Sequence, residues 1–256
     1  MENNEYRIMF DLESSYWWFL GKQFLVKNVL KTLRFHASEG ERILDLGCGT
    51  GMTLKILEDY GVSYGVEISR EAMLFLRKRN LNRIVCADVN GRLPFKDHSF
   101  SLVTCLDVLE HLERDRDLMV DMLRVCKPGG YVFVTVPAFN FFWSPHDTAL
   151  HHRRRYVRRQ LLRLVRGAKG KVIKASYYNT FLSLPIAGVR KFRALYEGDV
   201  GTKSDFFLAL PDPVNKVLST IFRLEVFLLN FVNYPFGVSL FVIARKGEDD
   251  IGSGKP

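Results

Sequence analysis

The sequence predicts an α/β protein with a doubly wound, mostly parallel sheet. Apolar runs that suit buried strands alternate with amphipathic stretches over residues 40–137, and this alternation is typical of βαβ units with helices on both faces of a sheet. A glycine-rich bend follows the first run, and an acid stands at the end of each of the next two. Such sheets bind ligands beyond the carboxyl ends of their strands, so these features predict a pocket in the first half of the chain.

The first run and its bend read Ile-Leu-Asp-Leu-Gly-Cys-Gly-Thr-Gly at residues 43–51. A helix is expected directly afterwards, because Met52, Ile56 and Tyr60 recur every four residues. Glycine has no Cβ, so the bend can adopt positive φ and expose backbone N–H groups to a polar or anionic ligand. The glycines differ in spacing from the dinucleotide pattern G-x-G-x-x-G; they are Gly47, Gly49 and Gly51.

Acidic residues close the second and third predicted strands. The second strand is expected over residues 63–69 and contains Glu67, 22 positions after Asp45. An acid about 20 residues beyond a glycine bend can accept hydrogen bonds from both hydroxyls of a ribose, and charge strengthens such bonds. The third strand is expected over residues 83–89, with Asp88 near its end.

Four further strands are expected, over residues 99–107, 131–137, 171–179 and 239–246. A helix precedes the second of these, and Pro128 and Gly129 would end it; its apolar stripe comprises Leu118, Met119, Met122, Leu123 and Cys126. The stretch before the last strand would carry a helix, from about Pro213 to Asn233, that is apolar nearly all round.

Over residues 40–137 the chain resembles the class I S-adenosylmethionine-dependent methyltransferases, in particular small-molecule enzymes of type 11 and a subgroup associated with glycan and lipid biosynthesis. Asp-x-Gly-x-Gly-x-Gly after a strand is their first motif, and Leu-Asp-Val-Leu-Glu-His at 106–111 resembles a later one. The resemblance implies a Rossmann-like fold of seven strands with an antiparallel last strand, S-adenosylmethionine as cofactor and S-adenosylhomocysteine as product. It assigns the adenine amino group to Asp88, a ring nitrogen to the N–H of Val89 and the methionine part to the Leu106 region. The full set of implied cofactor contacts is Asp45, Gly47, Cys48, Gly49, Gly51, Glu67, Ile68, Asp88, Val89 and Leu106.

We expect a single domain over residues 1–246 and a disordered tail at 247–256. The parts of the domain would be an N-terminal helical cap at 1–39, a cofactor-binding half at 40–137, a basic acceptor-side segment at 138–179 and an apolar helical insertion at 180–236. The cap carries the aromatic run Tyr16–Phe19, which resembles an N-terminal helix that covers the cofactor pocket and keeps water out. The alternative is that this helix packs against the edge of the sheet. Both can hold, with some rings covering the pocket and others packing on the sheet.

Positive charge is concentrated in one segment. Thirteen Lys and Arg and no Asp or Glu lie between Thr148 and Tyr196, so the rest of this +9 chain is net acidic. The asymmetry indicates an anionic partner; a solvated helix face is the alternative, although such faces usually mix signs. Aromatic, His and Arg side chains suit an acceptor with an apolar part and a phosphate or carboxylate; the acceptor-side candidates are Trp17, His146, Arg154, Arg155 and Tyr156.

Residues 226–244 carry no charge, a run of 19 residues. Length alone would allow a membrane span, but two Asn, a Pro and a Gly interrupt the run. The predicted helix is either buried in an extra layer or lies in a membrane interface, where the basic segment would face anionic headgroups. No charged-then-apolar leader precedes the domain, and the four cysteines form no C-x-x-C pair. We therefore expect a cytoplasmic protein with reduced thiols and no metal site, and contact with the inner face of the membrane if the helix is interfacial.

Together with these features, the resemblance implies transfer of a methyl group from S-adenosylmethionine to a small, partly apolar, anionic acceptor, by O-methylation of a lipid-linked, glycan or prenylated intermediate. A hydroxyl nucleophile needs a base, and an imidazole suits that role near neutral pH; the catalytic candidates are His111 and His152. An RNA acceptor is one alternative, with the basic segment on phosphates, although no Asn-Pro-Pro-Tyr pattern of base-amino methyltransferases follows the fourth strand. A non-catalytic membrane-surface protein that retains the pocket is the other.

Overall fold

The computed structural model describes residues 3–33, 35, 40–196 and 210–248. They form a seven-stranded sheet of order β3-β2-β1-β4-β5-β7-β6, in which β7 is antiparallel to β5 and β6 and the other pairs are parallel. The doubly wound sheet and its antiparallel last strand are thus confirmed. The strands are β1 (Arg42–Leu46), β2 (Val62–Glu67), β3 (Ile84–Cys86), β4 (Phe100–Leu106), β5 (Cys126–Pro137), β6 (Lys171–Tyr178) and β7 (Ser239–Arg245).

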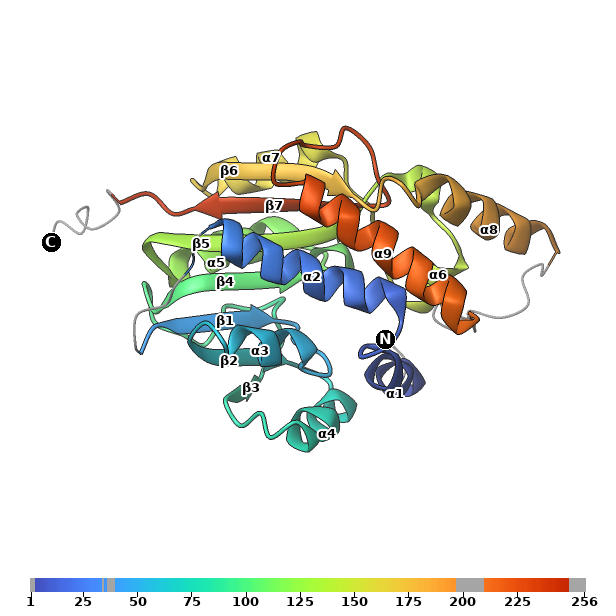
Figure 1. The fold of residues 1–256 in the computed structure, drawn as a ribbon. Helices are drawn as coiled ribbons and strands as arrows, with labels where there is room; N and C mark the ends of the chain where they lie inside the picture. Colours follow the sequence, from blue (N-terminus) through green and yellow to red (C-terminus); the bar gives the residue numbers. More distant parts are fainter. Residues whose placement is uncertain (1–2, 34, 36–39, 197–209, 249–256) are drawn as a thin grey trace, which may run out of the picture.

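Helices cover both faces of the sheet (Figure 1). On one face α2 (Trp17–Thr32) and α9 (Asp212–Leu228) run side by side, with α3 (Met52–Leu57) beside them. The opposite face is covered by α5 (Asp115–Val125) and α7 (Arg158–Gly167), whose apolar residues share a core with the inner strands. The remaining α-helix of the first half, α4 (Arg70–Lys78), packs Leu76 against Leu54 of α3.

Several short elements lie beyond the carboxyl ends of the parallel strands, at the right of Figure 1. The helices there are α1 (Asn3–Leu12), α6 (Pro145–Ala149) and α8 (Ser183–Tyr196). Two 3₁₀-helices, η1 (Leu109–His111) and η2 (Asn140–Phe142), follow β4 and β5. These elements surround the edge at which sheets of this type bind ligands.

The insertion helix α9 is apolar on two faces, and only one of them is buried. Phe222 and Val226 are buried against α2 and the sheet, and Gly21 of α2 makes room for the Phe222 ring, which lies 2.0 Å from where a Cβ would stand. On the other side Leu224 and Phe227 are more than half exposed. The helix is therefore neither wholly buried nor free of the fold. No helix among the described residues is long and apolar enough to cross a membrane.

Several predicted boundaries are wrong in detail. Cys126 begins β5 rather than ending the preceding helix, and the ladder between β4 and β5 is irregular over this Pro-Gly-Gly stretch. The third strand is three residues long, so Asp88 lies beyond it. α9 ends at Leu228 and not at Asn233, because its final turn closes at Leu229 and Tyr234 then bridges to β6. Most of the predicted tail, from residue 249, lies outside the described residues.

Candidate active site

The glycine bend between β1 and α3 takes a conformation that suits glycine. Gly47, Gly49 and Gly51 have φ of 66°, 54° and 90°, values that side-chain-bearing residues rarely adopt. The bend is tied to β2 by hydrogen bonds from the N–H groups of Gly47 and Cys48 to the carbonyl of Val66, at 2.8 and 3.1 Å. Gly47 and Gly49 line a cavity of about 500 Å³, which we call the main cavity.

Glu67 stands at the end of β2 and faces the same cavity. It is 5% exposed, and its Oε2 accepts a hydrogen bond of 2.8 Å from the N–H of Gly49. Its Oε1 accepts from the N–H groups of Ile68 and Ser69, at 2.9 and 2.8 Å. These bonds hold the carboxylate under the glycine bend, and each oxygen keeps acceptor capacity for a further donor.

The other predicted residues on the nucleotide side are placed at the rim and wall of the main cavity. Ile68, Asp88, Val89 and Leu106 all line it. Asp88 accepts bonds from the backbone and the side chain of Asn90, at 2.8 and 3.0 Å. The structure thus brings the ends of β2, β3 and β4 together around one space, as strand topology requires.

Three of the predicted cofactor contacts are not among the residues that line the cavity: Asp45, Cys48 and Gly51. Asp45 points into the sheet, where the Thr104 hydroxyl donates to it at 2.6 Å, and burial raises the pKa of Asp45 to about 7. The Cys48 sulfur packs against Gly65 of β2, 2.7 Å from where a Cβ would stand there. A Cβ at Gly51 would lie 2.5 Å from Leu81. These three residues support the bend through contacts on the side away from the cavity.

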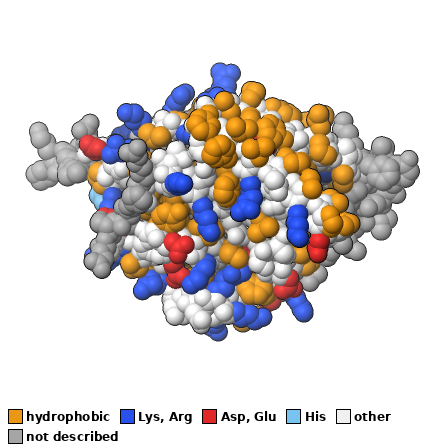
Figure 2. Space-filling view, in the orientation of Figure 1, with side chains coloured by type: hydrophobic (Ala, Val, Ile, Leu, Met, Phe, Trp, Pro, Cys, Tyr) orange, Lys and Arg blue, Asp and Glu red, His pale blue; other side chains and the backbone are white. Residues whose placement is uncertain are grey.

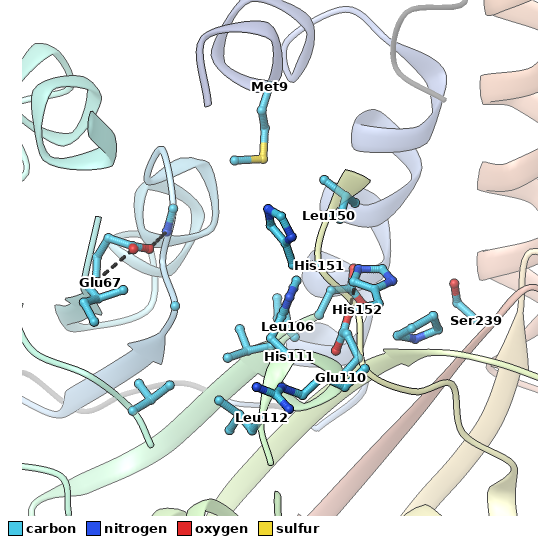
Figure 3. Close-up of a pocket in the computed structure, with 18 of the residues that line it drawn as sticks. Met9, Glu67, Leu106, Glu110, His111, Leu112, Leu150, His151, His152 and Ser239 are labelled. Carbon is cyan, nitrogen blue, oxygen red and sulfur yellow. Dashed lines mark hydrogen bonds and ion pairs between the residues drawn. The ribbon is translucent and has the colours of Figure 1, made fainter. Parts of the chain in front are cut away.

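Helix α1 covers the open side of the glycine bend and was not singled out as a lining element from sequence. Tyr6 and Met9 of α1 line the main cavity. In Figure 3 the side chain of Met9 lies between Glu67 and the histidines. The connection after α1 is anchored by buried Glu13, which pairs with Arg79 and accepts a bond of 2.6 Å from the Thr50 hydroxyl. Arg79 also donates to the Thr50 carbonyl at 3.0 Å.

A second group that sequence reasoning missed is an ion pair in the cavity wall. Lys22 of α2 pairs with Asp107, at the end of β4, and both residues line the main cavity. The Thr135 hydroxyl donates to Asp107 at 2.8 Å. Burial alone would raise the pKa of Asp107, but Lys22 and Thr135 hold that pKa below its usual range. The partners are 85 positions apart, so no local pattern reveals them.

The acceptor-side segment is organised around buried Asp147. His152 Nδ1 lies 2.8 Å from Asp147 Oδ1, and Arg155 donates to both carboxylate oxygens, at 2.8 and 3.0 Å. Burial would raise the pKa of Asp147, but these two partners hold it well below the usual range. Asp147 is therefore an ionised acceptor, and Nδ1 of His152 donates to it; in the neutral form of an imidazole so held, the lone pair is on Nε2.

The predicted anion-binding role of the neighbouring arginines does not fit their contacts. Arg155 lines the main cavity but is 5% exposed and paired with Asp147. Arg154 lies outside the cavity lining and pairs with Asp115 at 3.2 Å. Tyr156 is buried, and its hydroxyl donates to the same Asp115 at 2.8 Å. Segment 153–156 is thus fastened to Asp147 of α6 and to acids at the start of α5, which the count of charges along the sequence could not show.

The two catalytic candidates meet at the far wall of the main cavity. His111 and His152 have ring centroids 4.9 Å apart, and both line the cavity (Figure 3). Burial and the neighbouring His152 lower the pKa of His111 to about 4, so His111 is neutral at pH 7. His146 lines the cavity as well.

Buried Glu110 lies beside these histidines. Its Oε1 is 3.9 Å from His152 Nε2, and neither carboxylate oxygen has a hydrogen-bond partner among the described residues. Burial and the nearby Asp107 carboxylate raise the pKa of Glu110 well above its usual range, which favours the neutral acid. Glu110, His111 and His152 also offer ligand atoms within 4.8 Å of one another, a grouping that the linear spacing did not reveal.

Trp17, the remaining acceptor-side candidate, faces away from the main cavity. It is 7% exposed and belongs to the core that α2 and α9 share. Trp18 and Phe19, by contrast, line the main cavity. The aromatic run therefore divides between the core and the pocket, because successive helix positions point in different directions.

The fold and the pocket define the class of protein. A solved S-adenosylmethionine-dependent methyltransferase from Archaeoglobus fulgidus superposes with a TM-score of 0.53 at 20% identity, over 88% of this chain and 94% of that one. The chain has the fold of the class I S-adenosylmethionine-dependent methyltransferases. Residues 44–134 match the family model described as a methyltransferase domain. The matched residues make up about a third of the chain.

Curated relatives match about half of the chain. Ubiquinone biosynthesis O-methyltransferase of Vibrio cholerae is 25% identical over 146 residues, which are 52% of this chain and 59% of that protein. Demethylmenaquinone methyltransferase of Tropheryma whipplei is 31% identical over 130 residues, 50% of this chain and 52% of that protein. The chain therefore spans little more than half the length of these relatives.

Proposed function

We propose that the protein transfers the methyl group of S-adenosylmethionine to a small, partly apolar acceptor, by O-methylation. The observation that carries the proposal is a single cavity of about 500 Å³ that the glycine bend and Glu67 line together with His111 and His152. A nucleotide-binding edge and a candidate base thus face the same space, which is the arrangement that transfer from cofactor to acceptor needs.

On the nucleotide side, Glu67 would accept bonds from the ribose hydroxyls while its bonds from the bend hold it in place. Asp88 and the N–H of Val89 would meet the adenine, since both residues line the rim. Leu106 would flank the methionine part. The cofactor would supply an electrophilic methyl on its sulfonium, and the residues on this side of the cavity would orient it and exclude water.

On the acceptor side, His152 is the proposed general base. Asp147 holds Nδ1 at 2.8 Å, so Nε2, which lies 3.9 Å from Glu110 Oε1, would be the atom that takes the proton of the acceptor. A base held by a buried carboxylate keeps one tautomer and one ring orientation. His111, whose pKa burial lowers to about 4, is a weak base and would serve to position His152 or the acceptor.

The acceptor class rests on the chemistry of the site and on the relatives. A prenylated ring with a phenolic hydroxyl suits a cavity that combines apolar walls with histidines, and the Vibrio cholerae relative is named for ubiquinone biosynthesis. An RNA acceptor is less well supported, because Arg154 and Arg155 are engaged by acids. A prenylated acceptor would reside in a membrane. We therefore propose that the protein contacts an anionic membrane peripherally, through the exposed apolar side of α9.

The proposal is tested by measuring methyl transfer and cofactor binding on the same variants. With radiolabelled S-adenosylmethionine and a prenylated catechol as acceptor, H152Q and D147N should lower turnover ~10²–10⁴-fold while calorimetric affinity for S-adenosylhomocysteine stays unchanged. E67Q should instead weaken that affinity by ~1–3 kcal/mol. E113Q, an exposed acid near the site, is the control. Full turnover in H152Q would remove His152 from the chemistry, and no heat with either cofactor form would overturn the proposed function.

A further inference from the structure

A second, smaller cavity of about 150 Å³ opens between α2, α8 and α9. Aromatic and aliphatic side chains make up most of its wall, among them Trp17, Leu182, Ile186 and Leu218. We call it the apolar slot. Binding in a cavity with this lining is favourable for apolar groups, because polar groups placed there would lose their hydrogen bonds to water.

The apolar slot adjoins the main cavity. Trp18, His146 and Arg190 line both, so these three residues form the junction between them. Among the described residues that line the slot, the ionisable groups other than tyrosine are His146 and Arg190. Polarity therefore lies at the junction, and the slot becomes apolar with distance from the candidate base.

We propose that the apolar slot binds the hydrocarbon tail of the acceptor, while the acceptor's reactive headgroup lies in the main cavity beside His152. This inference rests on the proposed function and adds the substrate class: an amphiphile with an alkyl or isoprenoid chain attached to its polar head. A chain that passes Trp18 at the junction enters a space walled by Trp17 and Ile186. Each methylene that leaves water there adds roughly fourfold to affinity.

The slot also continues toward the surface. Val189 of its wall is 45% exposed, and Val217, next to the wall residue Leu218, is 57% exposed. A tail longer than the slot would pass over these side chains and join the exposed apolar side of α9. The acceptor would thus enter head first, from the side of the molecule that carries the apolar surface.

The tail site can be tested without an acceptor, because tryptophan reports on it. The chain has three Trp, and in a W143F background only Trp17 and Trp18 remain, both in the slot wall. The probes are 12-bromododecyl phosphate and 4-bromobutyl phosphate, whose bromine quenches indole fluorescence on contact. We expect saturable quenching by the long probe at a concentration at least tenfold lower than by the short one. The slot variants I186D and L218D should weaken the long probe at least tenfold.

The matched control is L184D, which places the same charge on α8 at a side chain that is 80% exposed and outside the slot wall. Circular dichroism and thermal melting establish that each variant is folded. Equal affinity for the two probes, or unchanged quenching in folded I186D and L218D, would overturn the tail site. Calorimetry with S-adenosylhomocysteine on the same samples separates the two claims, because loss of cofactor binding would contradict the proposed function and leave the quenching result standing.

Discussion

Glu110 is a carboxylic acid in an environment that disfavours its charged form. It is fully buried, and neither oxygen has a hydrogen-bond partner among the described residues. An ionised carboxylate in such a place is costly, and this is why burial raises its pKa. The local sequence Leu-Glu-His gives no sign of this, because the burial comes from β4, β5 and the acceptor-side segment meeting around η1.

We therefore predict a pH-dependent effect of E110Q. A raised folded-state pKa means that the folded protein holds its proton longer than the unfolded chain, so wild-type stability falls as pH rises from the unfolded pKa through the folded one. Glutamine removes this penalty, and the melting temperature of E110Q minus wild type should grow between pH 5 and pH 8. Each unit of pKa shift corresponds to about 1.4 kcal/mol, or ~3–6 °C in a chain of this size.

E113Q is the control for this measurement, because Glu113 is nearby and exposed. Its melting difference from wild type should stay flat across the same pH range. A flat difference for E110Q as well would show that Glu110 ionises freely in the folded protein.

At the scale of elements, the packing of α2 on α9 depends on one missing side chain. Gly21 lies in the middle of α2, where alanine would ordinarily favour a helix. Here a Cβ would lie 2.0 Å from the ring of Phe222, which is wholly buried. The close approach of the two helices therefore requires glycine at this position, and a helix propensity scale would suggest the opposite.

G21A should accordingly destabilise the protein by ~1–3 kcal/mol, the cost of overpacking a core. G188A is the matched control, because a Cβ at Gly188 of α8 meets nothing within 4 Å; it should be neutral or stabilising by ~0.5–1 kcal/mol. Urea unfolding measures both. A double variant, G21A with F222L, should recover part of the loss. An unchanged free energy of unfolding in G21A would mean that α9 can shift away from α2 without loss of stability, and would contradict this role of Gly21.

At the scale of the whole molecule, one face combines apolar and positive side chains. Figure 2 shows apolar side chains gathered over α9 with Lys and Arg around them. The most exposed of these apolar residues is Phe231, at 73%, and Phe227 is at 51%; Lys27, Lys31, Lys216 and Arg223 are exposed on α2 and α9. Such a surface suits the headgroup region of an anionic bilayer.

We predict that the protein floats with vesicles of anionic phospholipid and less so with zwitterionic ones, with ~1 kcal/mol from each cation near the surface. F227E and F231E together should reduce flotation at least tenfold. V120E is the control, because Val120 is exposed at 47% on α5, which covers the opposite face of the sheet. Equal flotation of the F227E/F231E double variant and of V120E would contradict a membrane contact through α9. Equal flotation of the wild-type protein with anionic and zwitterionic vesicles would do the same.

Sequence patterns were sufficient for the first half of the pocket. Strand periodicity, the positive-φ glycines and the position of Glu67 are local features, and parallel topology then brings their carboxyl ends together. Asp88, Val89 and Leu106 reached the cavity wall for the same reason. Asp45 did not, because side chains alternate along a strand and its carboxylate faces Thr104 instead.

The second half depended on partners that are distant in sequence. In the sequence Arg154 and Arg155 have no acidic neighbour, but in the fold they pair with Asp115 and Asp147. Lys22 pairs with Asp107 across 85 positions, and Glu13 reaches Thr50 across 37. Such ion pairs follow from the packing of helices on the sheet, which no local window contains.

The sequence by itself determined the order of strands and helices, the glycine bend and the class of ligand that the bend accepts, because each depends on residues close together in the chain. Only the tertiary structure decided which charges are neutralised, which imidazole has a carboxylate behind it and which side of α9 is left open. Those outcomes depend on burial, and burial is a property of surfaces that meet only after the chain has folded.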